Sequence, residues 1–377
     1  MMADLLEFRG LFPIHQEFAY FNHAAITPLN SRVAAAVQEY LEVTQRLPFE
    51  RWPAHLSAVV PRMKERAAQL IGAAAPTEIV PMANTAAGIN TAAQSLPLRA
   101  GDNVLVLEGD YPAVIYPWLN LAPRGVLVKW VPQVKGGLDL ETLTARIDSR
   151  TRVIAISTAM FATGFRNDIA AVGALCRERG IFLVVDAIQT LGAFPIDVQA
   201  CHIDFLACGA QKWLLSTPGS GFLYCRQELI ESLQLGAYVG TGSTVDGANY
   251  LDYNFTLLPT AERFNLGTPN LPGIVALDAA LGLILEAGPP RIGERVLALT
   301  EFLIADLQSR GYQVRSNLEP AHRSGIVIVA VPDPEAARLK LLAAGIITSV
   351  RGGGLRVSPH FYNREEELRR VSAVLDS

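Results

Sequence analysis

Between residues 85 and 225, short apolar runs alternate with segments of helical periodicity. The runs expected to form buried strands are residues 104–107, 153–157, 182–185, 205–208 and 221–225. The segments with helical spacing are residues 85–95, 140–147 and 168–179. Asp168 is expected to cap the last of these helices, and Gly180 to end it. This alternation predicts an α/β fold with a mainly parallel sheet that is covered on both faces.

The pattern changes after residue 273. A long stretch rich in alanine and leucine reaches about residue 307 and is expected to be helical. Residues 326–331 then predict a strand, and residues 365–375 predict a closing helix. The shift indicates a second, smaller domain at the C-terminal end.

Composition narrows the class of protein. The chain has 377 residues, of which 50% are hydrophobic and 18% charged, which suits one large domain with a smaller companion. Its net charge of −4 favours neither nucleic acid nor a membrane surface as a partner. We expect a cytoplasmic protein, because no signal segment or membrane-spanning run is present. The four cysteines form no CxxC pair, so we expect free thiols and no metal site.

Two charged side chains follow buried strands. Asp186 comes directly after the run at 182–185, and Lys212 lies just beyond the run at 205–208. The carboxyl ends of parallel strands meet at one edge, where ligands bind in open α/β sheets. A lysine there can form a Schiff base with a cofactor aldehyde, and a buried carboxylate can keep a pyridine nitrogen protonated. The pair therefore points to pyridoxal phosphate, although a lone lysine is more often a solvated loop residue.

The sequence around this pair resembles the signature of the class V aminotransferase family, which includes cysteine desulfurases, kynureninases and isopenicillin N epimerase. The matching positions are residues 186–197, 204–205 and 211–215, the last reading Gln-Lys-Trp-Leu-Leu. The likeness extends from about Tyr20 to the C-terminal helix.

The resemblance implies a fold and an assembly. The fold would be that of pyridoxal-phosphate-dependent transferases of fold type I, with a mainly parallel seven-stranded sheet. Residues 20–272 would form the large cofactor-binding domain, and residues 1–19 and 273–377 a smaller α+β domain. The resemblance also implies a homodimer with its active sites at the subunit interface.

The cofactor phosphate is expected at the start of the helix at 85–95, where unpaired N–H groups and the helix dipole favour an anion. The residues there are Asn84, Thr85 and Ala86, although an ordinary capped helix explains the segment equally well. Residues 263–270 are similar to the family's RFExGTPN motif. This similarity implies that Thr268 reaches the phosphate bound by the neighbouring subunit.

The resemblance also implies roles for residues at positions that match cofactor-binding positions of the family. Tyr111 would stack on the pyridine ring, although a tyrosine before proline is commonly a packing residue. Gln189 would bond the phenolic oxygen of the cofactor, and Gln211 stands beside the lysine.

The substrate carboxylate needs a clamp, which the planar fork of arginine provides. Arg356, in a segment similar to the family's R-x-S/A-P…YN sequence, is the first candidate, and Arg351 is the second. Asn22 and His23 resemble the family's substrate-entry segment, although an ordinary structural role explains His23 equally well.

The chain also departs from the family pattern. Cysteine desulfurases carry a nucleophilic cysteine just before the carboxylate arginine, but residues 349–356 contain none. Gln211 stands where histidine is common, and Gly209 replaces a polar side chain that often holds phosphate. Phe161 lies where desulfurases have asparagine. The missing cysteine argues against persulfide formation of that type. Gln211 and Gly209 would weaken cofactor binding, and Phe161 is more like the Y-x-T-G sequence of kynureninases and the epimerase-like branch.

The expected function is that of an enzyme that acts on an amino acid through an external aldimine. Lys212 would remove the α-proton while Arg356 holds the carboxylate and Asp186 stabilises the protonated ring nitrogen. The outcome is expected to be C–S or other β-elimination, or transamination. Epimerisation of the isopenicillin N epimerase type is the alternative.

Two alternatives come from other classes of protein. Gln211 and Gly209 are compatible with a non-catalytic regulatory protein that binds pyridoxal phosphate. A nucleotide-binding α/β protein would need a GxGxxG turn after a strand, and the sequence contains none.

Overall fold

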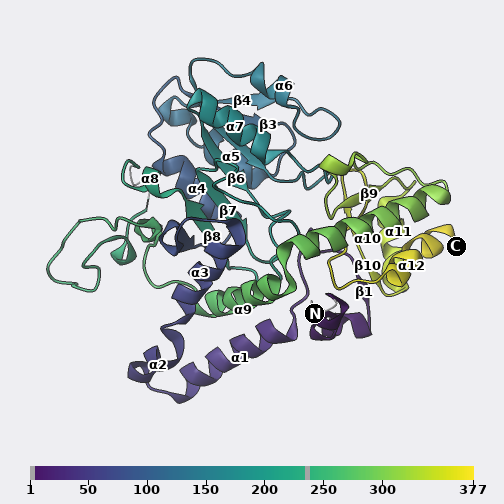
Figure 1. Cartoon of the computed structure of the whole chain (residues 1–377), viewed down its shortest axis with the longest axis horizontal. Coiled ribbons are helices and arrows are strands. Elements are labelled where there is room, and N and C mark those ends of the chain that lie inside the picture. Colours follow the sequence, from purple (N-terminus) through teal and green to yellow (C-terminus); the bar gives the residue numbers. More distant parts are fainter. Residues whose placement is uncertain (1–4, 234–237) are drawn as a thin grey trace.

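The computed structural model describes residues 5–233 and 238–377. Its largest element is a sheet with the strand order β2-β8-β7-β6-β5-β3-β4 (Figure 1). The strands are β2 (Ile79–Pro81), β3 (Asn103–Leu107), β4 (Leu127–Val131), β5 (Thr151–Ser157), β6 (Phe182–Asp186), β7 (Phe205–Gly209) and β8 (Gly221–Cys225). Strand β8 runs antiparallel to both of its neighbours, and the other neighbouring pairs are parallel. The predicted α/β fold with a mainly parallel seven-stranded sheet is confirmed.

Helices cover both faces of this sheet. Successive side chains of a strand point to opposite faces, and here both sets are apolar and need cover. In β6, Leu183 and Val185 belong to one apolar core and Val184 to the other. The first core includes residues of α3 (Val59–Ile71), α7 (Ile169–Arg179) and α9 (Leu271–Ala287), and the second includes residues of α4 (Thr85–Ser95) and α5 (Pro112–Leu119). A strand buried in this way must be apolar at every position, which explains the continuous runs in the sequence.

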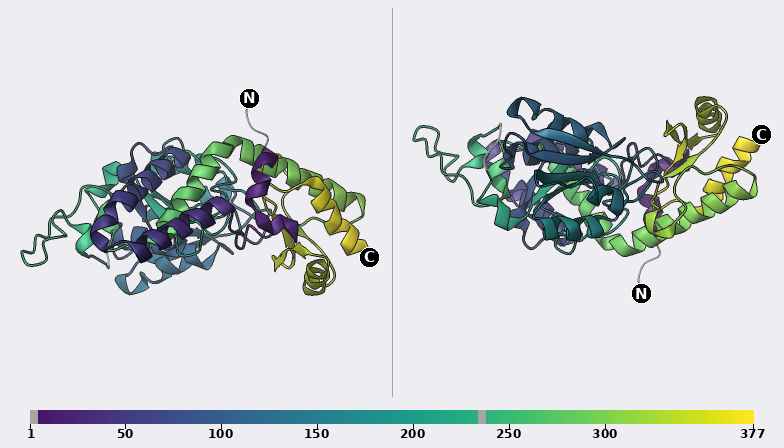
Figure 2. Two further views of the ribbon diagram at one scale, coloured as in Figure 1. Left: turned by 90° about the horizontal axis from the view of Figure 1, so that it is seen from below. Right: turned by 90° about the horizontal axis from the view of Figure 1, so that it is seen from above.

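The C-terminal part of the chain builds a smaller antiparallel sheet with the order β11-β12-β9 and an apolar core of its own. Its elements are α10 (Pro289–Ser309), β9 (Val327–Val329), α11 (Pro334–Ala343), β11 (Ser349–Arg351), β12 (Gly354–Val357) and α12 (Glu365–Asp376). The N-terminal segment joins this part, because β1 (Ala19–Tyr20) pairs with β10 (Ile346–Ile347). Both views of Figure 2 show the C-terminal part at one end of the molecule, reached along the long helix α10.

The remaining helices are short or lie at the surface. They are α1 (Ser31–Arg46), α2 (Pro53–Leu56), α6 (Leu140–Thr144) and α8 (Gln227–Ile230), together with 3-10 turns at Leu5–Leu11, Pro13–Gln16, Phe49–Arg51, Pro76–Glu78, Ala122–Arg124, Thr241–Ser243, Ala261–Phe264 and Pro320–His322. Within the described residues, no single helix is long and apolar enough to cross a membrane; α9 and α10 pass that test only as a bent pair, by length and composition.

The caps of α7 follow the prediction. The carboxylate of Asp168 accepts a hydrogen bond from the N–H of Ala171, and Gly180 ends the helix with a φ of 64°.

Three predicted elements are shorter or more divided than expected. Helix α6 ends at Thr144 because Asp148 accepts a bond from the N–H of Arg150 in a turn that competes with the helix. The long C-terminal stretch is two helices, bent by 78° at Gly288, where φ is 87°. The strand expected at 326–331 pairs with β12 only over Val327–Val329.

Candidate active site

The sequence-predicted residues meet in a cavity of about 380 Å³ at the carboxyl ends of β6 and β7. Its lining combines the two strand ends with the start of α4, the loop before α5 and the strands β11 and β12. The predicted residues that line it are Asn84, Thr85, Ala86, Tyr111, Asp186, Gln189, Gln211, Lys212, Arg351 and Arg356. We call it the Lys212 cavity.

Asp186 is the last residue of β6 and is 1% exposed. Its Oδ1 accepts a hydrogen bond from the N–H of Ile188 at 2.8 Å, whereas its Oδ2 has no partner among the described residues. Burial raises the pKa of Asp186, and the nearby charge of Lys212 opposes the rise. A buried carboxylate oxygen without a partner is costly, so this atom calls for a hydrogen-bond donor or a cation within the cavity.

Lys212 faces the same cavity and is 9% exposed. Burial lowers the pKa of its amine; Asp186 partly offsets this effect, and the charges of Arg356 and Arg351 add to it. Its Nζ lies 5.6 Å from the centroid of the Tyr111 ring. A lysine with a lowered pKa is partly neutral near pH 7 and can act as a nucleophile or a base.

The start of α4 provides a site for an anion. The Asn84 side chain caps this helix by accepting from the N–H of Ala87 at 2.9 Å. The Thr85 hydroxyl accepts from the N–H of Gly209 at 2.9 Å, which leaves its own hydrogen free to donate. The short side chain of Ala86 leaves the helix N-terminus open to the cavity. A phosphate fits this set of donors.

Gly209 and Gln211 form a complementary pair. A Cβ atom at Gly209 would lie 2.7 Å from Oε1 of Gln211 and 3.3 Å from Oγ1 of Thr85. The glycine therefore makes room for the Gln211 side chain beside the phosphate donors. The buried Oε1 of Gln211 has no partner within the described residues.

Two aromatic rings form one wall of the cavity. Tyr111 precedes α5, is 44% exposed and meets Phe161 edge-to-face with centroids 5.2 Å apart. Asp110, which the sequence analysis missed, holds this loop against β5. Its carboxylate accepts from the N–H of Tyr111 at 2.7 Å and from the N–H of Ser157 at 2.9 Å. Its position in the sequence, between the end of a strand and the predicted ring-stacking residue, could have indicated this role.

Arg356 lies on β12 and is 2% exposed. Its Nε donates to Oγ of Ser349 at 3.1 Å and its Nη1 to the carbonyl of Phe161 at 3.2 Å. Burial lowers its pKa to about 10, with a contribution from Arg351. The guanidinium is thus fixed in place and still has N–H groups for a carboxylate. Arg351 is exposed, and its Nη1 donates to the carbonyl of Val350.

Three predicted site residues do not line the Lys212 cavity. His23 is fully buried; its ring nitrogens contact the carbonyl of Ser358 and the hydroxyl of Tyr362, which is the structural role weighed for it. Asn22 forms a backbone bridge with Ser358 instead. Thr268 lines a second cavity of about 670 Å³, beside Asn90 and Asn270.

The donor set fits pyridoxal phosphate. One cavity contains a group suited to each part of this cofactor. The unpartnered carboxylate oxygen suits the ring nitrogen, and the amine suits the aldehyde. The aromatic wall suits the ring face, and the helix N-terminus suits the phosphate. Fold and site therefore define the class of enzymes that use pyridoxal phosphate on an α/β scaffold.

The chain belongs to the aminotransferase class-V family, whose family model matches residues 19–372. It is an enzyme of that family. The resemblance seen in the sequence is therefore confirmed over nearly the whole chain.

Similar proteins include aminotransferases and cysteine desulfurases. The chain is 29% identical to the uncharacterized aminotransferase YcbU of Bacillus subtilis, with 97% of this chain and 95% of that protein covered. It is 30% identical to a cysteine desulfurase of Cronobacter sakazakii, with 100% and 98% covered. These names favour the lyase and aminotransferase expectations over epimerisation.

Solved structures show the same fold. A cysteine desulfurase of Thermococcus onnurineus NA1 superposes with a TM-score of 0.91 at 23% identity and covers 100% of this chain and 98% of its own. The cystine C–S lyase C-DES, solved with its product cysteine persulfide, gives a TM-score of 0.87 at 22% identity, with 97% and 99% covered.

Proposed function

We propose that this enzyme binds pyridoxal phosphate in the Lys212 cavity and acts at the α-carbon of an amino acid, as a C–S or other β-lyase or as an aminotransferase. The observation that carries the proposal is one shared cavity. It contains the Lys212 amine, the unpartnered Oδ2 of the buried Asp186 and the open N-terminus of α4.

The bound cofactor would supply an aldehyde that reacts with amines and a ring that withdraws electrons from the α-carbon. We infer that Asn84, Thr85, Ala86 and Gln211 hold its phosphate. The Asp186 carboxylate would hold the proton on the ring nitrogen, because an adjacent positive charge favours the charged form of a buried acid.

For the substrate, we infer that Arg356 binds the carboxylate, with Arg351 beside it at the cavity mouth. Lys212, whose pKa is lowered by burial, would take the α-proton as a neutral amine. Tyr111 and Phe161 would limit the positions open to the substrate and keep water from the reacting bond.

The cavity also bears on sulfur chemistry. None of the described residues that line it is a cysteine, and Cys176, Cys208 and Cys225 are buried elsewhere. This supports release of the eliminated group to solution or to a small acceptor, rather than transfer to a cysteine of this cavity.

We also propose a homodimer with the two domains expected from the sequence, residues 20–272 and residues 1–19 with 273–377. The separation of Thr268 from the Lys212 cavity supports this assembly, because Thr268 would then serve the neighbouring subunit. A cytoplasmic location stays a prediction from the sequence.

The visible absorbance of the purified protein with added pyridoxal phosphate tests the proposed function. We expect an absorption band in the wild type that is lost in Lys212→Ala and that shifts when the substrate amino acid is titrated in. Lys135→Ala, which changes an exposed lysine paired with Glu319, is the matched control and should keep the band. A protein without a Lys212-dependent band would overturn the proposal.

A further inference from the structure

We propose that Trp213 is a positioning residue for the cofactor. Its indole N–H fixes the side-chain amide of Gln189, so that an N–H of Gln189 rather than its carbonyl oxygen remains for the Lys212 cavity. The inference rests on the proposed function, because it concerns what Gln189 presents to bound pyridoxal phosphate.

The two neighbours of Gln189 require the same orientation of its amide. Gln189 lines the Lys212 cavity and is 3% exposed. Its Oε1 accepts from Nε1 of Trp213 at 3.2 Å, and its Nε2 donates to the carbonyl of Ala24 at 3.2 Å. An indole nitrogen can only donate and a backbone carbonyl can only accept, so each contact alone specifies which end of the amide faces it. One N–H of Gln189 stays available.

Close packing fixes the position of the indole, so its N–H orients the Gln189 amide. Trp213 is 0% exposed. Gly325 packs against its ring so closely that a Cβ atom there would lie 2.3 Å from Cη2. On the backbone side, Nε2 of His360 contacts the Trp213 carbonyl at 3.1 Å, and the two rings lie 5.4 Å apart. Residues from the C-terminal part of the chain thus hold in place the indole N–H that donates to Gln189.

The orientation has a chemical consequence. The family resemblance implies that Gln189 lies beside the phenolic oxygen of the bound cofactor. A donor there would stabilise the anionic form of this oxygen, whereas a carbonyl oxygen would repel it. Without the Trp213 N–H, the buried Oε1 of Gln189 loses its partner and the amide loses one of the two contacts that orient it. The hydrogen bond from Gln189 to the anionic oxygen would then weaken, and the pKa of the bound chromophore would rise.

The test is a pH titration of the visible band of the holoenzyme. We expect Trp213→Phe to raise the pKa of the band by roughly 0.5 to 1 pH unit, as the loss of about one hydrogen bond implies. Trp118→Phe is the matched control, because Trp118 is fully buried and its Nε1 has no partner among the described residues. It removes an indole N–H from another part of the core and should leave the pKa unchanged.

A double mutant tests whether Trp213 acts through Gln189. Gln189→Leu is expected to raise the pKa of the band at least as much as Trp213→Phe, and adding Trp213→Phe to Gln189→Leu should cause no further rise. An equal shift in both backgrounds, or no shift in Trp213→Phe, would overturn the inference. If Trp213→Phe does not fold, benzothienylalanine at position 213 keeps the shape of the ring, lacks the N–H and has the same expected result.

The outcomes separate this inference from the function on which it rests. A wild type without a Lys212-dependent band would remove both. A normal band whose pKa does not respond at Trp213 would overturn only the positioning role.

Discussion

Among single residues, Arg356 should separate substrate binding from cofactor binding most clearly. Its guanidinium is buried and fixed by Ser349 and Phe161, and it does not belong to the proposed phosphate donors. Arg356→Gln should raise the amino-acid concentration for half-saturation by about 10- to 100-fold, because a charge-assisted, two-pronged contact is lost. The Lys212-dependent absorption band should remain. Titration of this band with the amino acid measures the concentration for half-saturation.

Arg351→Gln is the comparison for that change. Arg351 is exposed, so the loss of its charge should weaken binding by less than about fivefold. A larger effect at Arg351 than at Arg356 would contradict the assignment of the carboxylate clamp.

The buried histidines predict a dependence of stability on pH. Burial lowers the pKa of His360 to about 4 and that of His23 well below its usual value. The unfolded chain takes up these protons near pH 6.5 while the folded chain does not, so each histidine costs stability as pH falls below 6.5. The loss for His360 is about 2 kcal/mol at pH 5.

Urea unfolding at pH 7.5 and pH 5 checks this prediction. His360→Gln should reduce the difference between the two unfolding midpoints, and His55→Gln, on the exposed surface of α2, should leave the difference unchanged. Burial raises the pKa of Asp186, so Asp186 adds stability as pH falls, opposite to the histidines. For this reason the difference between the two pH values is compared between variant and wild type. An unchanged difference in His360→Gln would refute the neutral buried histidine.

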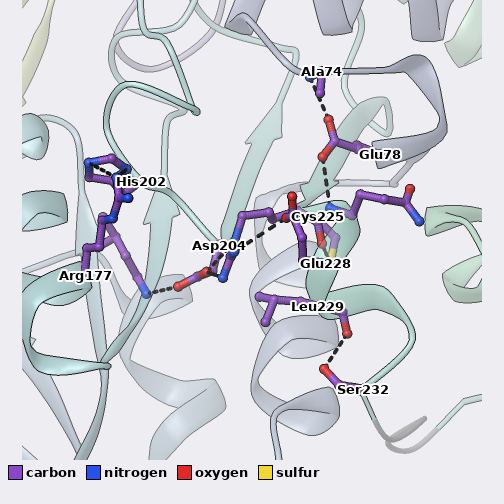
Figure 3. Close-up of polar contacts among 12 residues, drawn as sticks. Ala74, Glu78, Arg177, His202, Asp204, Cys225, Glu228, Leu229 and Ser232 are labelled. Atoms are coloured by element: carbon purple, nitrogen blue, oxygen red, sulfur yellow. Dashed lines mark hydrogen bonds and ion pairs between the residues drawn. The ribbon is translucent and has the colours of Figure 1, made fainter.

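Among the elements, the strand ends remote from the Lys212 cavity are joined by hydrogen bonds and one ion pair; Figure 3 shows polar contacts around Asp204 and Glu78. Asp204, just before β7, accepts from the N–H of Leu183 at 2.8 Å and from Nη2 of Arg226, just after β8, at 2.7 Å. Glu78 accepts from the N–H of Gln227 at the same edge. Asp204→Asn should lower the free energy of unfolding by about 1 kcal/mol, because the buried bond from Leu183 loses its charged acceptor and the part-exposed pair with Arg226 loses its charge.

Thermal unfolding measures that loss, and the absorption spectrum supplies the control. Because Asp204 and Lys212 lie beyond opposite ends of β7, the band of the holoenzyme should be unchanged. A lost band with normal stability would show that the two edges of the sheet are not independent.

Elements also show how far the sequence could predict this molecule. The central strands were found because two covered faces require continuous apolar runs. The edge strand β4 was missed because Leu127 and Trp130 are 58% and 41% exposed, and β2 because it has only three residues, one of them proline. Asp186 and Lys212 could be placed because both follow the carboxyl ends of predicted parallel strands, which meet at one edge of the sheet. The link from Trp213 to Gln189 could not, since it depends on how side chains pack.

On the scale of the whole molecule, the region 238–260 is held to the rest of the chain near its two ends, where the Ser243 hydroxyl donates to the Asn265 carbonyl and the Gln227 amide donates to the Pro259 carbonyl. It projects from the end of the molecule remote from the C-terminus (Figures 1 and 2). Its exposed apolar side chains include Tyr250, Leu251, Tyr253 and Phe255, each at least 71% exposed. Apolar side chains gathered in this way mark interaction surfaces, which agrees with the proposed homodimer.

Thr268 allows the shared active site to be tested in mixed dimers. A dimer of one Lys212→Ala subunit and one Thr268→Ala subunit contains one site with both residues intact only if Thr268 serves the neighbouring subunit. We expect Thr268→Ala homodimers to bind pyridoxal phosphate about 10-fold more weakly, because one hydrogen bond to a charged phosphate is lost. Differently tagged, co-expressed mixed dimers should regain a band of wild-type affinity at half the intensity. Mixed dimers that bind the cofactor as weakly as Thr268→Ala would show that Thr268 acts within its own subunit.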